Sequence, residues 1–353
     1  MAVTIRDVAA KAEVSFQLAS AVLGNKKYAR AAAATRKKIL DAARTLGYVP
    51  NISARILRGD SSKIIGVLID TRAAESMYEV LAEIESGADE LGYRILSAQA
   101  HDNPEKLLQA YYSLKQNGVD GIISFSHDYA QLGCHLDRQL KDDPKIVFVL
   151  NAPEGVGASV DVDYHGSMKA AVSHLTANGY RNPALLLLND WNENEKLPLS
   201  RQKRVDGFRS CTAPESKVYF IASPENDIDG IAEKCGKLIQ EKLLPDHVDA
   251  VIAKNDNLAA ILMKELLTRG IRIPQDFGLI GFDNRLIGKC LPVTLSSLYY
   301  DKKELADSVL KILLDKIAGK TDPVRVICKM NFIPRESTDK NFKLTKHYER
   351  KNS

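Results

Sequence analysis

The sequence predicts an N-terminal all-α helix-turn-helix head, followed by an α/β core of two doubly wound parallel-sheet subdomains. Three observations lead to this fold class. The chain has 353 residues, more than one small core usually organises. Residues 1–47 carry three short helical stripes of apolar residues. Beyond residue 60, short apolar runs alternate with helix-length amphipathic segments.

The first helix is predicted over Ile5–Ala12. Thr4 is a residue type that caps helix N-termini, and Asp7 adds an acidic group to the first turn. Four apolar residues then recur at helical spacing: Ile5, Val8, Ala9 and Ala12. One face of this helix is therefore expected to be buried in the head.

Two more helices follow at short intervals. Ser15 is placed to cap a second helix, which Gly24 and Asn25 end, and a third helix is predicted over Thr35–Leu46. Two helices joined by so tight a turn form a helix-turn-helix, whose second helix can lie in the DNA major groove. The stretch that begins at Phe16 is therefore the expected recognition helix.

Charge supports this interpretation, because it is divided unevenly along the chain. Residues 1–60 contain eleven basic and four acidic residues, whereas the remainder contains 38 basic and 41 acidic residues. A concentrated positive segment on an otherwise acidic chain is typical of binding to a polyanion such as nucleic acid. A run of charged residues is more commonly an ordinary solvent-exposed surface. Charge alone therefore does not decide between such a surface and a nucleic-acid-binding one.

The core is predicted from six apolar runs, which are expected to be strands: Ile64–Ile69, Gly121–Phe125, Ile146–Leu150, Ala184–Leu188, Ala250–Ala253 and Leu279–Gly281. Helix-length segments such as 78–91 and 106–116 separate them. Such alternation builds parallel sheets covered by helices on both faces, and a chain this long is expected to form two, with a cleft between them. Ligands of such folds bind beyond the carboxyl ends of strands, which makes five residues candidates for the cleft: Asp70, Asn151, Asn255, Asp256 and Asp283.

Several function classes are not supported. No apolar run reaches the roughly 18 residues of a membrane span, and the N-terminus lacks the apolar region of a secretory signal, so a cytoplasmic protein is expected. The five cysteines are scattered without C-x-x-C spacing, which predicts reduced packing residues and no zinc site. Neither G-x-S-x-G nor H-E-x-x-H occurs, and Gly281–Cys290 has the wrong spacing for a P-loop. We expect no catalytic residue, metal or cofactor; an enzyme would require Asp256 or Asp283 to hold a metal.

Longer motifs carry a family resemblance. The runs TIRDVAAKAEVS (4–15), TRKKILDAARTLGYVPN (35–51) and ARILRG (54–59) resemble the head of lactose-repressor and galactose-repressor family regulators. The resemblance continues through the core in IIGVLID (64–70), VDGII (119–123), NGYRNPALL (178–186), RVDGF (204–208), NDNLA (255–259), IGFDN (280–284) and PREST (334–338). It covers nearly the whole chain except about the last dozen residues.

The resemblance implies a ligand-responsive DNA-binding transcriptional regulator, expected to be a repressor, with a core similar to periplasmic sugar-binding proteins. It implies a homodimer on a pseudo-palindromic double-stranded operator at the bacterial nucleoid, controlled by a small-molecule effector, expected to be a carbohydrate. In this family, binding of the effector releases DNA in some members and recruits DNA in others.

The same resemblance sets the expected domain boundaries. The head covers 1–47 and the hinge 48–60. One core subdomain is expected from 61–162 with 292–322, and the other from 163–291 with 323–340. The basic, polar segment 341–353 lacks leucine heptads and is expected to be a disordered tail, so no tetramer is predicted on it.

Particular head residues are expected to contact DNA. Phe16 and Gln17 fall where the family reads bases, since glutamine can bond adenine and phenylalanine can contact a thymine methyl. The alternative for Phe16 is a buried core aromatic. The other expected contacts are to the phosphate backbone or serve as helix caps: Thr4, Ser15, Ser20, Asn25, Lys26, Lys27 and Tyr28.

The hinge segment 50–59 is shorter than the roughly 12 residues that hold an isolated helix in water. In the family this stretch becomes a helix on the operator, where a leucine inserts into the minor groove. Leu57 matches that leucine, Ala54 is small enough for close approach, and Asn51 belongs to the same expected contact set. The alternative is a simple linker with an exposed leucine.

Two departures from the family pattern affect the head. Residues 18–21 read Leu-Ala-Ser-Ala where Thr-Val-Ser-Arg is common, so an expected phosphate contact and a base-reading arginine are absent. Residues 31–34 are all alanine where Val-Ser-Glu-Glu is typical, which removes the cap of the third helix. An altered operator preference is expected; the alternative is a sugar-binding sensor whose head is degenerate.

The expected effector residues are Asp70, Asn151, Trp191, Arg204, Asn255 and Asp283. Arg204, Asn255 and Asp283 match recurring polar positions of the family and supply the donors and acceptors that a sugar requires. Asn151 stands where aspartate is frequent, and residues 74–77 replace the family's Asn-Pro-Phe-Phe. Trp191 is expected to stack on a sugar ring, with cover for a sheet edge as the alternative.

Overall fold

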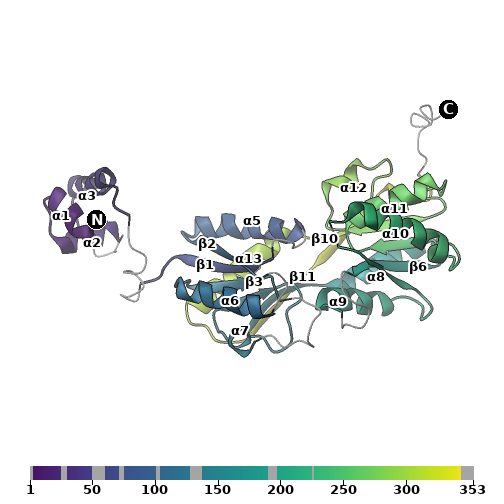
Figure 1. Cartoon of the computed structure of the whole chain (residues 1–353), viewed down its shortest axis with the longest axis horizontal. Helices are drawn as coiled ribbons and strands as arrows, with labels where there is room; N and C mark the ends of the chain where they lie inside the picture. The colour runs from purple at the N-terminus through teal and green to yellow at the C-terminus, as the bar shows by residue number, and fades with distance from the viewer. Residues whose placement is uncertain are drawn as a thin grey trace. The chain divides into compact units, whose positions relative to one another are not determined.

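The computed structural model describes residues 3–24, 30–49, 60–70, 75–100, 104–127, 137–189, 197–224 and 226–342. The chain divides into two compact units, residues 1–62 and 63–353 (Figure 1). The first unit contains the helical head and the second contains both sheets.

The head consists of α1 (Ile5–Lys11), α2 (Phe16–Leu23) and α3 (Ala33–Leu46). All three predicted helices are present, and the predicted caps Thr4 and Ser15 are confirmed. α3 begins two residues before the predicted Thr35, because alanine has a high helix propensity and extends the helix toward its N-terminus. A buried cluster of small and branched side chains joins the three helices: Val8, Ala9, Ala12, Ala19, Val22, Ile39, Ala42 and Ala43.

The first sheet is wholly parallel, in the order β11-β5-β4-β3-β1-β2. Its strands are β1 (Ile64–Ile69), β2 (Arg94–Gln99), β3 (Gly121–Ser124), β4 (Ile146–Val149), β5 (Ala158–Val162) and β11 (Val324–Cys328). The helices around it are α5 (Glu75–Glu90), α6 (Pro104–Gln116), α7 (Arg138–Lys141) and α13 (Lys302–Ile317).

Both faces of this sheet are buried, as its continuous apolar strands require. Alternate residues of β1 point to opposite faces: Ile65 and Val67 belong to the core with α5 and α13, whereas Leu68 belongs to the core with α6 and α7. Gly66 leaves room for α6, because a Cβ at this position would lie 2.9 Å from Cδ1 of Leu114.

The second sheet has the order β12-β10-β9-β8-β6-β7, in which only the pair β10 and β12 is antiparallel. Its strands are β6 (Pro183–Asn189), β7 (Val218–Ala222), β8 (Ala250–Ala253), β9 (Gly278–Phe282), β10 (Ser296–Tyr300) and β12 (Met330–Ile333). The accompanying helices are α8 (Tyr164–Ala177), α9 (Leu199–Arg209), α10 (Ile228–Leu238), η1 (Ile239–Leu243), α11 (Asp256–Thr268), α12 (Leu286–Cys290) and η2 (Glu336–Thr338). The predicted fold class is confirmed.

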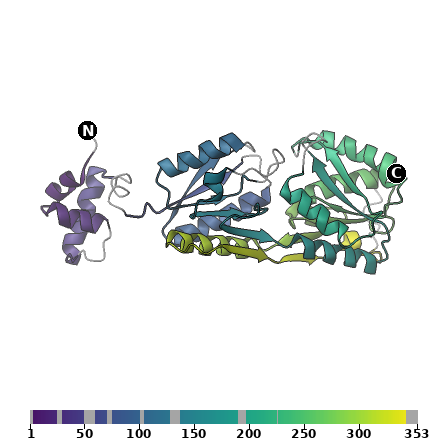
Figure 2. The same ribbon diagram turned by 90° about the horizontal axis from the view of Figure 1, so that it is seen from below.

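The chain crosses between the sheets three times: from β5 to α8, from β10 to α13, and from β11 to β12 (Figure 2). This pattern corrects two predicted segments. β10 lies in 292–322, which was assigned to the first subdomain, but it pairs with β9 of the second. β11 lies in 323–340, which was assigned to the second subdomain, but it pairs with β5 of the first. An apolar pattern identifies a strand without identifying its sheet, which explains both errors.

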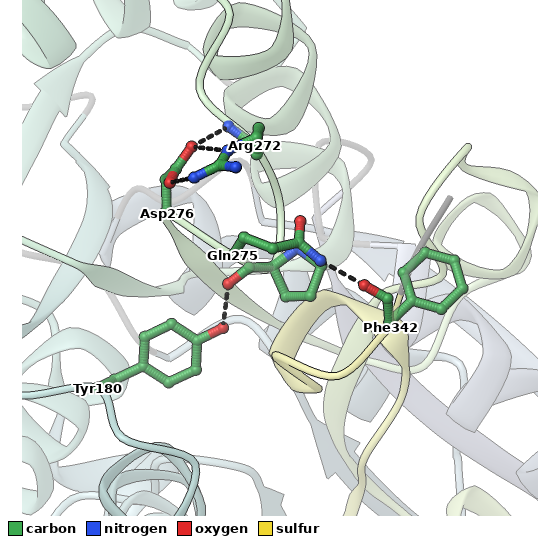
Figure 3. A network of polar contacts seen from close by, with 6 residues as sticks. Tyr180, Arg272, Gln275, Asp276 and Phe342 are labelled. Atoms are coloured by element: carbon green, nitrogen blue, oxygen red, sulfur yellow. Dashed lines mark hydrogen bonds and ion pairs between the residues drawn. The ribbon is translucent and has the colours of Figure 1, made fainter. Parts of the chain in front are cut away.

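The chain remains packed on the second subdomain through Phe342. Its side chain contacts that subdomain's core, and the Gln275 side-chain amide donates a hydrogen bond to its carbonyl oxygen (Figure 3). Beside this contact, the Tyr180 hydroxyl donates to the carbonyl oxygen of Pro274 at 2.7 Å. The predicted tail, 341–353, was therefore wrong in including Phe342, which buries apolar surface. Residues 343–353 lie outside the described residues.

Candidate functional site

The first turn of α2 presents two side chains to solvent. The Ser15 hydroxyl accepts a hydrogen bond from the backbone N–H of Leu18 at 3.2 Å, which fixes where the helix begins. Ala19 and Val22 face the head core, and Phe16 and Gln17 are exposed on the opposite side. Phe16 is 48% exposed, which excludes the alternative that it is a buried core aromatic. An exposed phenylalanine beside an exposed glutamine can contact a base methyl and a base edge.

Thr4 caps the N-terminus of α1. Its hydroxyl donates to Oδ2 of Asp7 at 2.7 Å, and the same oxygen accepts the Thr4 N–H at 2.8 Å. These hydrogen bonds lower the pKa of Asp7. Ser20 is half-buried on α2. The remaining expected DNA contacts lie outside the described residues: Asn25, Lys26, Lys27, Tyr28, Asn51, Ala54 and Leu57.

An ion pair connects α3 to the turn between α1 and α2. Nζ of Lys38 lies 2.6 Å from Oε2 of Glu13, and this hydrogen bond lowers the pKa of Glu13. Glu13 itself has a φ of 51°, the left-handed conformation that lets the chain turn between the two helices. The turn that orients α2 is thus held from the third helix.

The alanine run leaves α3 without a side-chain cap. Ala32 occupies the cap position with φ of −58° and ψ of 149°, and its methyl side chain cannot accept the free N–H groups of the first turn. Ala32→Ser is expected to stabilise α3 by about 1 kcal/mol, which slows opening of its amides about fivefold. Hydrogen exchange of the full-length protein measures this. The control is Ala34→Ser, inside the helix, and an equal effect there would contradict the capping explanation.

Arg204 projects from α9 toward the end of the second sheet. Its Nη1 donates to the carbonyl oxygen of Lys254 at 2.7 Å, and its guanidinium carbon lies 4.4 Å from the ring centroid of Phe282. The ring of Tyr164 lies on the guanidinium as well, at 5.2 Å. Among the described residues, the buried Nε has no hydrogen-bond partner. A buried donor without a partner costs free energy, and a ligand acceptor would recover it.

Asp283 follows β9 in a left-handed conformation, with φ of 87°, and its N–H donates to the carbonyl oxygen of Leu298 at 2.7 Å. Burial raises the pKa of its carboxyl group, and the charges of Arg204, Lys302 and Arg285 partly offset this effect. These three cations come from both subdomains.

The first subdomain contributes polar groups at the ends of three strands. Asn151 follows β4 with φ of 57°, and its N–H donates to Oδ1 of Asp161 at 3.2 Å. Its own Oδ1 is buried and has no partner within the part of the chain that the structure describes. Ser126 follows β3, and its hydroxyl oxygen is also buried without a partner in the described ranges. The buried Asp70 ends β1, where its carbonyl oxygen accepts the Tyr78 hydroxyl at 2.8 Å. Sequence reasoning missed Ser126, although its place after a strand was a usable signal.

The two predicted residues at the start of α11 have structural roles. Asn255 caps the helix, since its Oδ1 accepts the N–H of Leu258 at 2.9 Å. Asp256 is fully buried, where it accepts the Ser297 hydroxyl at 2.7 Å and the N–H of Arg285 at 2.5 Å. Burial raises the pKa of Asp256 to about 7. Trp191 lies outside the described residues.

Ion pairs join the two subdomains. Arg285, which precedes α12, pairs with Glu75 and Glu79 of α5. Within the first subdomain, Lys302 of α13 also pairs with Glu79. At a second place, Lys203 of α9 pairs with the buried Asp161 of β5. Sequence reasoning missed these pairs because their members are far apart in the chain.

An apolar groove of about 650 Å³ lies on the second subdomain. Its lining comes mainly from α10, α11 and α12: Leu188, Ile228, Ile231, Asn255, Asn257, Leu258, Ala260, Ile261, Met263, Lys264, Leu267, Thr268, Ile287, Leu291 and Pro292. Three of these apolar side chains are substantially exposed, namely Ile228 at 63%, Ile287 at 43% and Leu267 at 36%. We call this surface the α11 groove.

The described segments contain no cluster of three or more histidine, cysteine, aspartate or glutamate side chains suited to a metal ion. Cys211, Cys235, Cys290 and Cys328 are free thiols. Among the helices of the described ranges, none combines the length and apolar character needed to cross a bilayer.

Comparison with known proteins assigns the chain to a family. Residues 4–51 match the model of bacterial regulatory proteins of the lacI family, and residues 172–338 match the periplasmic binding protein-like domain. The chain is 31% identical over 333 residues to the HTH-type transcriptional repressor PurR of Vibrio parahaemolyticus, covering 92% of this chain and 94% of that protein. The chain belongs to the lacI family. A second lacI-family relative, the transcriptional regulator DegA of Bacillus subtilis, is 28% identical, with 86% of this chain and 88% of DegA covered.

Solved structures of lacI-family proteins have the same fold. The lac repressor dimer bound to operator and the anti-inducer ONPF matches with a TM-score of 0.80 at 23% identity, covering 96% of this chain and 99% of that one. The regulator CelR in complex with cellobiose matches with a TM-score of 0.63 at 21% identity, covering 95% and 99%. As a lacI-family member the protein is a DNA-binding transcriptional regulator with a ligand-binding core, and not an enzyme.

Proposed function

We propose that the protein is a repressor that binds a pseudo-palindromic operator as a homodimer and changes its affinity when a sugar binds in the core cleft. One observation carries this proposal: Phe16 and Gln17 stand exposed at the first turn of α2, where a recognition helix meets base edges. In the sequence, residues 1–60 supply eleven basic side chains against four acidic ones for attraction to the phosphate backbone. The operator complex would form on the bacterial nucleoid.

The α11 groove supports the homodimer, with a second copy of the chain as its occupant. A palindromic operator has two half-sites, so two heads must be held together. Exposed apolar side chains such as Ile228 and Ile287, on a groove of about 650 Å³, supply the surface that such pairing would bury. The fold neighbour with a TM-score of 0.80 is a dimer on its operator.

The cleft supports a sugar as effector. Arg204 Nε, Ser126 Oγ and Asn151 Oδ1 are buried polar atoms without partners among the residues that the structure describes, and Asp283 adds a carboxylate acceptor. A polyhydroxy compound can donate to and accept from such groups at the same time. Two lacI-family fold neighbours were solved with carbohydrates, one with cellobiose and one from Alkaliphilus metalliredigens with D-xylulofuranose. Effector binding across two subdomains would change their closure and, through the hinge, the affinity for the operator.

Substitutions in α2 test the DNA-binding part. Phe16→Ala and Gln17→Ala are each expected to lower operator affinity about tenfold or more, since one good base contact contributes about 1–3 kcal/mol of discrimination. Affinity for unrelated DNA should stay the same, because phosphate contacts dominate it. The operator would come from selection of bound duplexes out of a random DNA pool, with and without a panel of sugars.

The matched control is Leu40→Ala, which removes a 44% exposed apolar side chain from α3. It should leave operator affinity unchanged. A pool that yields no palindrome, while a sugar still binds in calorimetry, would favour a sensor with a degenerate head and contradict the repressor proposal.

A further inference from the structure

We infer that Arg285 is a positioning residue, whose ion pairs with Glu75 and Glu79 of α5 hold the two subdomains together before any effector binds. In this role Arg285 acts through α5, and its contribution does not depend on which compound the cleft binds. Three features of the structure support the role: a rigid turn that carries Arg285, two carboxylates that are fixed on α5, and the place of these contacts beside a crossing between the subdomains.

A rigid turn after β9 carries Arg285. The two residues before it, Asp283 and Asn284, are both in the left-handed conformation, with φ of 87° and 52°. The N–H of Asn284 donates to Oγ of Ser297 at 3.0 Å. The N–H of Arg285 donates to Oδ2 of Asp256 at 2.5 Å, and the Ser297 hydroxyl donates to the other oxygen of this buried carboxylate at 2.7 Å. The second subdomain thus fixes the backbone from which the guanidinium projects.

The carboxylates that Arg285 contacts are fixed on α5. Glu75 and Glu79 are four residues apart, which places both side chains on one face of the helix. Oε2 of Glu79 is buried, and Nζ of Lys302 pairs with it from the first turn of α13. The next residue of α5, Val80, is fully buried in the core of the first subdomain. The first subdomain therefore presents two ordered carboxylates to a cation of the second.

The guanidinium of Arg285 contacts both carboxylates at once. Its Nη2 pairs with Oε2 of Glu75, and its Nη1 lies 3.5 Å from Oε1 of Glu79. The Arg285 side chain is 22% exposed, so solvent and salt screen its pairs less than they screen pairs between fully exposed side chains. An isolated exposed ion pair contributes little, whereas one guanidinium between two carboxylates forms a small network that contributes more.

These contacts lie beside the crossing from β10 to α13. Lys302, which pairs with Glu79, comes two residues after Tyr300, and Tyr300 ends β10 of the second sheet. The side chain of Ser76, also on α5, is hydrogen-bonded to Tyr300. In a hinge motion, a small displacement beside the crossing changes the angle between the subdomains and becomes larger with distance from the crossing. Arg285 therefore acts where a short-range contact can set the relative position of the subdomains.

The same turn carries Asp283, a residue of the proposed effector site. The charge of Arg285 lowers the pKa of the Asp283 carboxyl group, against the larger effect of burial. An effector that contacts Asp283 would therefore bind to the turn that Arg285 connects to α5. Its binding and the position of the subdomains would then be coupled, since each affects the same turn. This consequence, unlike the ion pairs themselves, rests on the proposed function.

Distances between the subdomains of the full-length protein, without ligand, test this role. Spin-labelled noncanonical residues replace the exposed Tyr112 of α6 and Lys237 of α10, one in each subdomain, and electron paramagnetic resonance measures the distance between them. Labelled protein is diluted into unlabelled protein, so that each distance lies within one chain. Arg285→Ala is expected to increase the population with longer distances at least threefold. Raising the salt from about 0.05 to about 1 M should shift the wild type in the same direction and the variant little, because salt screens the ion pairs.

Arg272→Ala is the matched control, because Arg272 pairs with Asp276 inside the second subdomain, and its distances should equal those of the wild type. Arg285→Lys keeps the charge and should restore most of the wild-type distribution. Replacing both Glu75 and Glu79 by glutamine removes the same contacts from α5, which keeps the test decisive if Arg285→Ala folds poorly. Adding Arg285→Ala to that double variant should have no further effect, since all three changes remove one set of contacts.

The positioning role and the proposed function fail separately. If no sugar changes operator affinity while Arg285→Ala still lengthens the distances, the effector proposal loses its support and the positioning role stands. If the wild type, Arg285→Ala and the double glutamine variant all have equal distances, the positioning role is wrong, whether or not a sugar changes operator affinity.

Discussion

Ile287→Glu is expected to convert the protein from a dimer to a monomer and to lower its operator affinity at least about 100-fold. Ile287 is 43% exposed in the α11 groove, among apolar neighbours such as Leu267 and Leu291. In the proposed dimer a glutamate there would be buried without a partner, at a cost of several kcal/mol, and each 1.4 kcal/mol weakens association about tenfold. Sedimentation equilibrium and operator titration measure the two effects.

The control is Phe220→Glu, which introduces the same charge at a 39% exposed apolar side chain of β7, outside the groove. This variant should remain dimeric and bind the operator normally. If Ile287→Glu and Leu267→Glu both stay dimeric at micromolar concentration, the α11 groove is not the pairing surface.

Arg204→Met is expected to abolish the effector response, with effector affinity reduced about 100-fold or more. Methionine keeps an apolar stem against Phe282 but removes the buried Nε donor and the charge beside Asp283. A charged hydrogen bond lost in a buried site costs about 1.5–3 kcal/mol, and the carboxylate left without its cation adds to that cost. Operator affinity without effector should change little, because Arg204 is not in the head.

The measurement is titration of the operator with and without a sugar. The sugar is the one that changes which duplexes the protein selects from the random DNA pool. Arg209→Met is the matched control, since Arg209 is exposed in the last turn of the same helix. An unchanged sugar response in Arg204→Met would remove Arg204 from the site.

The pH dependence of effector binding tests independently whether the carboxylate of Asp283 binds the effector. Because burial raises the pKa of Asp283, its carboxylate is protonated at a higher pH than an ordinary aspartate. Effector affinity that depends on the carboxylate should be full above the raised pKa and decline as the pH falls through it. Asp283→Asn is expected to bind more weakly and to lose this decline.

Local signals made the elements of the fold predictable. The capping residues Thr4 and Ser15 and the apolar runs Ile64–Ile69 and Ala250–Ala253 act on their own neighbours in the chain, and the structure has them as predicted. The sheet membership of β10 and β11 was wrong, because it depends on which distant strand each one meets.

The effector site stays a prediction. Arg204, Asn151 and Asp283 were proposed for it from strand ends and family motifs; among the described residues, Arg204 and Asn151 each have a buried polar atom without a partner, and charged groups act on Asp283. The pairing of Arg285 with Glu75 was not predictable, since it joins residues of two subdomains. Nor did the sequence show that Asp256 is fully enclosed, which follows from its contact with Ser297 on a crossing strand.

The three crossings between the sheets also govern how the protein is completed during synthesis. The buried cluster of the head lies within residues 8–43. By contrast, β11 and β12 complete the two sheets from residues 324–333, which leave the ribosome much later than the head. At roughly 5–20 residues per second, the chain carries a whole head for many seconds before either subdomain is finished. A nonsense codon near residue 323 would therefore expose β5 and β10 as unpaired edges in both subdomains at once, a defect that promotes aggregation.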